Sequence, residues 1–146
     1  MPNKKRLVEL RIPSIFGYEK VAMVTVMAVA ARLGMSGERA EDLRTAVAEA
    51  CINAIEYGNR EDAGTPVTIT VSIDDHHLIV DVRDRALGAT RPHMGRMVDL
   101  QNPPSGPHAN MGLFLIHHLV DKVDIVCRDN GTHVHMAMRL PEMVLH

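Results

Sequence analysis

The order of the predicted elements indicates a two-layer α/β sandwich, with helices on one face of a mixed, mainly antiparallel sheet. Three observations lead to this fold class. An alternating strand pattern opens the chain, two helical patterns follow it, and two hairpin patterns lie on either side of a third helix. The 146 residues are enough to bury one hydrophobic core, so we predict a single domain over residues 1–146.

The first half of the chain predicts one strand and two helices. Leu7 to Pro13 alternates apolar and polar residues and ends at a proline, as a half-buried strand does. Gly17 to Leu33 predicts the first helix. Its run Val21 to Ala31 is too short to cross a bilayer and is apolar enough to be buried on nearly all sides, by the domain or partly by a second subunit. The second helix is expected to have its N-cap at Ser36 and to stop at Gly58.

The second helix has an apolar face and a polar face. The apolar residues are Leu43, Val47, Ala50 and Ala54, and the polar residues are Asp42, Thr45, Glu49, Asn53 and Glu56. Glu49 and Asn53 are four residues apart, so their side chains project to the same side. A carboxylate beside a neutral oxygen ligand suits a hydrated Mg²⁺ ion, and the carboxylate can accept a proton from a nucleophile. Taken alone, such a pair is more commonly a solvated polar surface.

Two hairpins are predicted in the second half. Residues 67–74 and 77–84 alternate around the turn Asp75-His76, and residues 123–129 and 132–140 alternate around Asn130-Gly131. Asp84 ends its strand next to a long loop. It is either an ordinary turn residue or an acceptor for an amino group such as that of adenine.

A long loop and a third helix lie between the two hairpins. Residues 85–109 are rich in proline and glycine with little periodicity, which is typical of a functional lid or a disordered segment. Residues 109–124 are expected to form a helix with Asn110 and Gly112 in its first turn. The first N–H groups of a helix lack intrahelical partners and its dipole is positive there, so this end suits an anion such as phosphate.

The composition limits the classes of partner and the cellular compartment that we expect for this protein. The net charge of −2 and a pI near 6.5 give no basic footprint, so direct binding to nucleic acid is disfavoured. Cys51 and Cys127 lie far apart in apolar segments, which fits buried thiols and a cytoplasmic location. His133 and His135 share a strand face, but no cysteine spacing of a zinc site accompanies them. We interpret these histidines as surface or edge residues.

Four short segments, taken in their order along the chain, match one set of known motifs. "EACINAIEYG", "DVRDRALGA", "NMGLFLIHHLVDKVD" and "NGTHVHMAMRL" resemble, in turn, the N box, the two glycine boxes and the closing Gly-Thr strand of the Bergerat-fold ATPases. That superfamily includes DNA gyrase and the sensor histidine kinases. The resemblance runs from about residue 5 to about residue 140. Within the superfamily, the chain looks most like the bacterial anti-sigma factor serine kinases.

The resemblance implies a fold, a cofactor and a role for each matching residue. The fold is the histidine-kinase-like α/β sandwich, residues 85–109 are the ATP lid, and the cofactors are ATP and Mg²⁺. Glu49 matches the general base that deprotonates a substrate serine, and Asn53 the Mg²⁺ ligand. The remaining matches are Asp84 for adenine, Gly88 in the box of Asp84, Asn110, Gly112 and Leu113 in the phosphate-side box, and Thr132 in support of Asp84.

The resemblance also implies partners. Such kinases phosphorylate a small anti-anti-sigma protein on serine, hold a sigma factor away from RNA polymerase and commonly form homodimers. No direct nucleic-acid or membrane contact is implied. A kinase of this family that regulates a phosphatase or a stress-signalling scaffold is a further alternative.

Two positions depart from the family pattern. Ala86 and Asn110 stand where glycines are expected. Asn110 either adopts a left-handed conformation and leaves the phosphate site intact, or caps the helix and weakens that site. The departures favour an alternative, a protein-interaction module of the same fold that does not bind nucleotide. The lid offers Arg91, His93, Arg96 and His108 as cations for a triphosphate.

Overall fold

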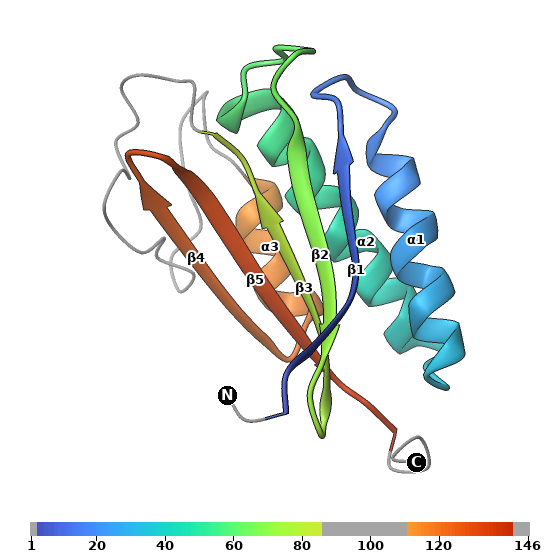
Figure 1. The fold of residues 1–146 in the computed structure, drawn as a ribbon. Helices are drawn as coiled ribbons and strands as arrows, with labels where there is room; N and C mark the ends of the chain where they lie inside the picture. Colours follow the sequence, from blue (N-terminus) through green and yellow to red (C-terminus); the bar gives the residue numbers. More distant parts are fainter. Residues whose placement is uncertain (1–2, 86–110, 142–146) are drawn as a thin grey trace.

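The computed structural model describes residues 3–85 and 111–141 of the chain (Figure 1). Along the chain lie β1 (Lys5–Ile12), α1 (Glu19–Arg32), α2 (Gly37–Asn53), a π-helical turn (Ala54–Gly58), β2 (Val67–Ile73), β3 (His77–Arg83), α3 (Met111–Leu119), β4 (Lys122–Arg128) and β5 (Gly131–Arg139). The predicted element order is therefore confirmed. The third helix is shorter than predicted: it ends at Leu119, and β4 begins three residues later at Lys122.

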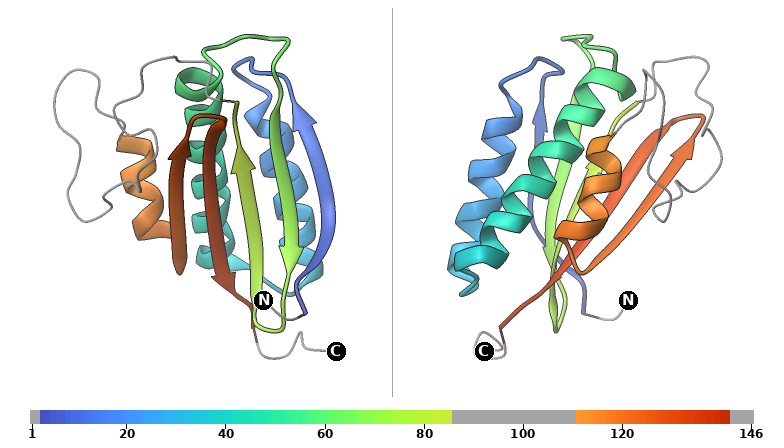
Figure 2. Two further views of the ribbon diagram at one scale, coloured as in Figure 1. Left: turned by 60° about the vertical axis from the view of Figure 1, so that its left-hand side comes forward. Right: turned by 180° about the vertical axis from the view of Figure 1, so that it is seen from behind.

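The strands form one sheet in the order β1-β2-β3-β5-β4. Every neighbouring pair is antiparallel, so the sheet in the described ranges is wholly antiparallel and the prediction of a mixed sheet is wrong in this respect. β3 and β4 do run in the same direction, but the hairpin places β5 between them. In the described part of the chain, α1, α2 and α3 cover one face of the sheet and no helix lies on the other (Figures 1 and 2).

The hydrophobic core lies between the sheet and the helices, with α2 at its centre. Leu43, Val47, Ala50 and Ala54 are all buried, which confirms the predicted apolar stripe. They pack with the inward-facing residues of β2, β3 and β5, which alternate with mostly polar residues on the open face. α3 packs beside α2 and completes the layer.

Helix α1 is less buried than its sequence predicts. Ala22, Val26 and Ala30 form the one fully buried stripe, at the four-residue spacing of a helix face. Val21 and Val24 are 47% and 69% exposed. The prediction of a helix buried on nearly all sides by the domain is thus wrong, because the run is apolar on every face while the domain covers only one. Burial of the remaining side by a second subunit stays a prediction.

The other predicted boundaries can be checked directly. Ser36 occupies the N-cap position of α2 in an extended conformation, without a capping hydrogen bond from its side chain. The hairpin turn before β3 is held by Asp74, whose Oδ1 accepts the backbone N–H groups of His76 and His77. Within the described ranges, none of the helices has the length and apolar character needed to cross a bilayer.

An ion pair joins the start of α2 to the residues that follow α3 and to the C-terminal end of β5. Arg39 Nη1 and Nη2 donate to the two carboxylate oxygens of Asp121 at 3.2 and 2.7 Å. Arg39 also donates to the carbonyl of Arg139, and Asp121 accepts the Arg139 N–H at 2.6 Å. The hydrogen bond from Arg39 lowers the pKa of Asp121, against a smaller opposing effect of partial burial. This ion pair lies at the end of the sandwich that is opposite to the C-terminal end of α2 (Figure 2).

Replacing this carboxylate gives a pH-dependent loss of stability. Asp121→Asn is expected to lower the free energy of unfolding at pH 7 by about 1 kcal/mol or less, since exposed pairs are screened by solvent. The folded state depresses the pKa of Asp121. The stabilisation is therefore complete above the unfolded pKa near 3.9 and is lost as the pH falls through the folded value.

Urea unfolding of wild type and variant from pH 7 to about pH 3 measures this effect, and the difference between them should shrink at the acid end. Asp129→Asn, an exposed carboxylate at the β4–β5 turn, is the control and should match wild type throughout. An equal difference at both ends of the range would contradict the assignment to the ionised carboxylate.

Candidate functional site

The end of α2, the end of β3, the start of α3 and the β4–β5 turn lie at one end of the molecule (Figures 1 and 2). These segments carry most of the described residues that the sequence predicts for the site. Among the buried polar residues of the protein, Asn53, Asn59, Asp84 and Thr132 belong to this end. Hydrogen bonds account for three of them and leave one without partners.

Asn53 is the residue without partners. Its side chain is 2% exposed, and neither Nδ2 nor Oδ1 has a hydrogen-bond partner among the described residues. An unsatisfied buried polar group costs about 1–3 kcal/mol, so such a group in a native protein needs an explanation. A ligand that accepts from the amide nitrogen or is held by the carbonyl oxygen would remove this cost.

Glu49 lies one helical turn before Asn53 on the same face of α2. Its side chain is half-buried, and in the described part of the chain it forms no hydrogen bond or ion pair. The carboxylate is therefore available to a substrate. The two residues thus combine an uncommitted carboxylate with an uncommitted amide, as the sequence predicts for this face.

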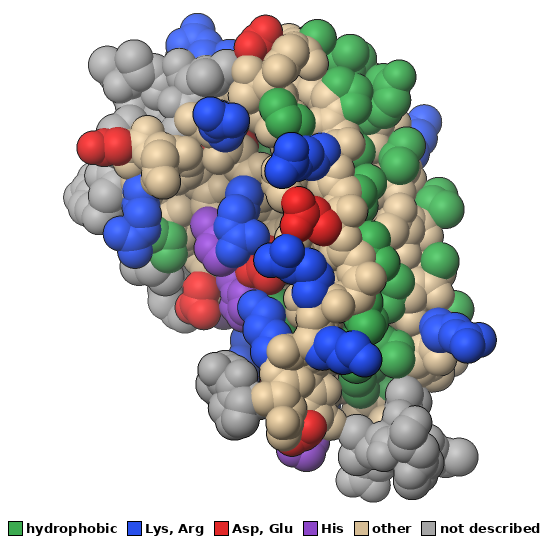
Figure 3. All heavy atoms as spheres, viewed as in Figure 1, with side chains coloured by type: hydrophobic (Ala, Val, Ile, Leu, Met, Phe, Trp, Pro, Cys, Tyr) green, Lys and Arg blue, Asp and Glu red, His purple; other side chains and the backbone are tan. Residues whose placement is uncertain are grey.

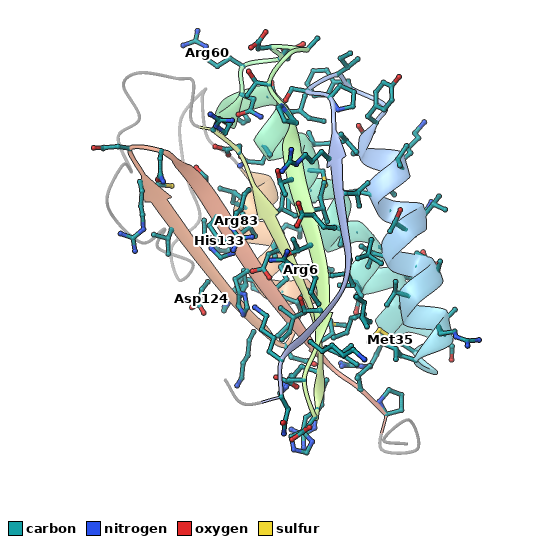
Figure 4. All side chains as sticks on the ribbon, in the orientation of Figure 1. Arg6, Met35, Arg60, Arg83, Asp124 and His133 are labelled. Atoms are coloured by element: carbon teal, nitrogen blue, oxygen red, sulfur yellow. The ribbon has the colours of Figure 1, made fainter. Side chains whose placement is uncertain are left out.

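Helix α2 changes its winding directly after Asn53. Ala54–Gly58 forms a π-helical turn, closed by the Asn59 N–H, which donates to the Ala54 carbonyl at 2.8 Å. Turns of this kind are rare and frequently mark functional sites. The chain then reverses through Arg60 and Glu61, which both adopt positive φ angles of 52° and 57°. Figure 4 shows Arg60 in this reversal, at the end of the molecule that carries the site.

Asp84 is buried at the end of β3 and is positioned by β5. Its Oδ1 accepts the Thr132 backbone N–H at 3.0 Å, and its own N–H donates to the Thr132 carbonyl at 3.1 Å. Thr132 is buried as well, and its hydroxyl lies 3.8 Å from the sulfur of Cys127. The structure thus brings Asp84 and Thr132 together, and the backbone of Thr132 makes the contact.

Two glycines make room for Asp84. A Cβ on Gly58 would overlap the Oδ2 and Cγ atoms of Asp84, and a Cβ on Gly131 would overlap its backbone carbonyl. Gly131 also has a φ of 143°, which other residues rarely adopt. Sequence reasoning gives Gly58 only the role of a helix stop and Gly131 that of a turn. In the structure both residues also fix the place of Asp84 against the end of α2.

Asn59 is a residue of the site that the sequence does not single out. It is fully buried, and its Oδ1 accepts the backbone N–H of Arg85 at 2.7 Å. Its Nδ2 donates to Ser14 Oγ at 3.0 Å and to the carbonyl of Pro66 at 3.1 Å. One side chain therefore ties the chain beyond Asp84 to the loops after β1 and before β2. In the sequence, only the position of Asn59 next to Gly58 could have indicated that it belongs to the site.

The phosphate-side segment is described in part. Gly112 lies in the first turn of α3 and is half-buried, and Leu113 is buried in the core. Gly88, Asn110 and Ala86 lie outside the described residues, as do the lid cations Arg91, His93, Arg96 and His108. The structure accordingly places Asn53, Asp84, Thr132 and the start of α3 at one end of the molecule (Figures 1 and 2). The roles of all the predicted site residues remain predictions.

The two cysteines are not among the residues that the sequence predicts for this site. Cys51 and Cys127 are free and buried, as the sequence predicts. Burial, with a smaller effect from the charge of Glu19, raises the pKa of Cys51 to about 12. A thiol with such a pKa stays protonated near neutral pH and is a poor nucleophile.

The chain is similar to known proteins over almost its whole length. A family model described as "Histidine kinase-like ATPase domain" matches residues 17–138. The serine-protein kinase RsbW of Bacillus cereus (strain ATCC 10987 / NRS 248) is 30% identical over 141 residues, which cover 94% of this chain and 87% of that protein. An anti-sigma F factor of Pasteuria penetrans is 30% identical over 139 residues, covering 94% and 93% of the two chains.

A solved structure supports the fold independently. The crystal structure of RsbU and RsbW domains from a Mycobacterium tuberculosis protein superposes with a TM-score of 0.66 at 18% identity. It covers 91% of this chain, and this chain spans 32% of that one. The predicted family is thereby confirmed: the chain belongs to the histidine kinase-like ATPases, and within them to the family of the RsbW serine-protein kinases and anti-sigma F factors.

Proposed function

We propose that this protein is an ATP-dependent protein serine kinase that also acts as an anti-sigma regulatory factor. The observation that carries the proposal is the buried, unpartnered amide of Asn53, with the uncommitted carboxylate of Glu49 one turn away. The family relationship supports nucleotide binding, and the similarity to a serine-protein kinase and to an anti-sigma F factor supports kinase activity and a sigma factor partner.

In this proposal Asp84 reads the base. A buried carboxylate accepts hydrogen bonds and can select the exocyclic amino group of adenine over a carbonyl at the same position. The Thr132 N–H holds Oδ1, and the Gly58 backbone lies against Oδ2 without a side chain between them. Because Asp84 is held on both sides, it can discriminate between bases with little loss of conformational entropy on binding.

Asn53 and Glu49 act at the phosphate end. The Oδ1 atom of Asn53 would hold Mg²⁺, which neutralises phosphate charge when it is bound with ATP. Glu49 would accept the proton of the attacking serine hydroxyl of a substrate protein. The first N–H groups of α3, which begins at Met111, would bind phosphate oxygens together with Gly112. Gly88, Asn110 and Leu113 complete the proposed nucleotide site.

The proposed partners are proteins. The substrate is a small anti-anti-sigma protein phosphorylated on serine, and the second partner is a sigma factor that the kinase holds inactive. A homodimer is also proposed. The exposed valines of α1 leave apolar surface available for protein contacts.

Thermal and urea unfolding with and without Mg²⁺-ATP tests the nucleotide site. A ligand at about a hundred times its dissociation constant adds roughly 2.7 kcal/mol to the free energy of unfolding. The variant Asn53→Ala should lose most of this gain. Without nucleotide it should remain within about 1 kcal/mol of wild type, because the amide it removes has no partner to lose.

The two measurements have distinct outcomes. Absence of any stabilisation of the wild type at millimolar Mg²⁺-ATP would refute the kinase and favour the interaction module that does not bind nucleotide. If the wild type is stabilised and Asn53→Ala is stabilised equally, nucleotide binds but the role of Asn53 is refuted.

A further inference from the structure

The open face of the sheet carries a compact cluster of three metal-binding side chains. Asp81 on β3 lies directly opposite His135 on β5, and His133 lies two residues earlier on the same face of β5. His133 Nε2 and His135 Nδ1 each lie 2.6 Å from Asp81 Oδ1. One ligand atom from each residue therefore falls within 4.8 Å of the others.

The surroundings of the cluster are visible on the face turned away from the helices. Figure 3 shows histidine side chains gathered there among lysine and arginine side chains. Figure 4 places His133 with Arg83, Arg6 and Asp124 on this face. Asp124 on β4 is opposite His135 in the register of the sheet. β5 is an inner strand, so the histidines are surface residues as predicted but do not lie at an edge of the sheet.

Asp81 is an unusual residue for the open face of a sheet, because its side chain is only 2% exposed. A buried carboxylate requires a cation or several donors beside it. Here His133, His135 and, at 3.8 Å, the Nζ atom of Lys4 surround the carboxylate of Asp81.

We propose that Asp81, His133 and His135 form a binding site for one divalent transition-metal ion of the Zn²⁺ class. Two imidazoles and a carboxylate suit Zn²⁺, Co²⁺, Ni²⁺ or Cu²⁺, whereas Mg²⁺ and Ca²⁺ take oxygen ligands. The site is separate from the proposed nucleotide site, since the helices and Asn53 lie on the other face of the sheet (Figure 2). It does not depend on the proposed function.

The geometry needs little change to accept the ion. Ligands at about 2.0–2.1 Å around a tetrahedral ion are separated by about 3.3 Å. Each histidine nitrogen, now 2.6 Å from Asp81 Oδ1, would therefore move away from that oxygen by less than about 1 Å. The backbone is fixed, because β3 and β5 are both paired on two sides. The histidine side chains are 35% and 31% exposed, which leaves water access to a fourth coordination position.

One neighbouring cation competes with the metal. Lys4 Nζ lies 3.8 Å from Asp81 Oδ2, and its side chain is 40% exposed just before β1 begins. A metal ion would be repelled by this charge at short range, and removing the charge should increase metal affinity. This contact gives the site a variant with a predicted gain of affinity, which a loss of folding cannot imitate.

The experiment uses the full chain, stripped of metal with a chelator and kept reduced. Titration with Zn²⁺ by calorimetry, in the absence of nucleotide, should show one equivalent bound, and Co²⁺ should give the visible absorption of a low-symmetry site. His133→Gln, His135→Gln and Asp81→Asn should each weaken binding by at least about tenfold. Lys4→Gln should strengthen it.

The matched control is the pair of adjacent histidines on α3. The double variant His117→Gln with His118→Gln removes two imidazoles, one more than either single variant, and should leave the affinity unchanged. Circular dichroism checks the fold of each variant; if Asp81→Asn fails to fold, the two half-exposed histidine variants carry the test. Absence of one-equivalent binding in wild type, or equal affinity in the His133 and control variants, would overturn the proposal and leave a hydrogen-bonded ionic cluster.

Discussion

Glu49→Gln is expected to abolish most phosphoryl transfer while nucleotide binding persists. The carboxylate is half-buried and uncommitted in the described structure, so its replacement by an amide of the same shape disturbs no packing and breaks no bond. A positioned general base contributes about 10²–10⁴-fold to the rate of such a step. The loss should appear in kcat, because a general base at Glu49 would act on the hydroxyl proton and not on the bound nucleotide.

The measurement follows phosphate incorporation into the proposed substrate, an anti-anti-sigma protein, by mass spectrometry. Mg²⁺-ATP affinity of the same preparations is measured separately by calorimetry. Glu56→Gln is the matched control, since Glu56 belongs to the same polar row and is exposed in the π-helical turn. Its rate should equal that of wild type. Transfer by Glu49→Gln within a few-fold of wild type would remove Glu49 from the mechanism.

Periodicity predicts the elements and the buried face of α2, but not how much of α1 the domain covers. Strands and helices follow from the spacing of apolar residues, and the buried stripe from Leu43 to Ala54 is predicted residue by residue. Helix α1 was predicted to be buried on nearly all sides because it is apolar all round, and no spacing within it indicates which side the domain covers. Composition therefore overestimates burial where periodicity is weak.

The site shows the same limit at long range. Glu49 and Asn53 are found from local spacing because one helix carries both of them. Asn59 links residues 14, 66 and 85, and Asp81 joins histidines more than 50 residues away, so no local pattern reveals either role. The sequence gives the types of residue available, and the register of β3 with β5 decides which of them meet.

Gly58→Ala is expected to damage both stability and nucleotide affinity, because the new Cβ would overlap the carboxylate of Asp84. That carboxylate has little freedom to move, since Oδ1 is bound to the Thr132 N–H and the side chain is buried. Forcing extra volume into such a site costs about 1–3 kcal/mol. If Asp84 reads adenine, its displacement should weaken Mg²⁺-ATP binding by at least about a hundredfold, which corresponds to about 2.7 kcal/mol.

Gly64→Ala is the matched control, because a Cβ at that position meets nothing within 4 Å. It should leave affinity unchanged and stability within about 0.5 kcal/mol. The double variant Gly58→Ala with Asp84→Ala separates the two effects, since it removes the carboxylate that the new methyl group would strike. The double variant should lose less free energy of unfolding than the two single variants lose together, as expected for residues in contact. If Asp84 reads adenine, the affinity of the double variant should not recover, because base recognition would require the carboxylate that this variant lacks.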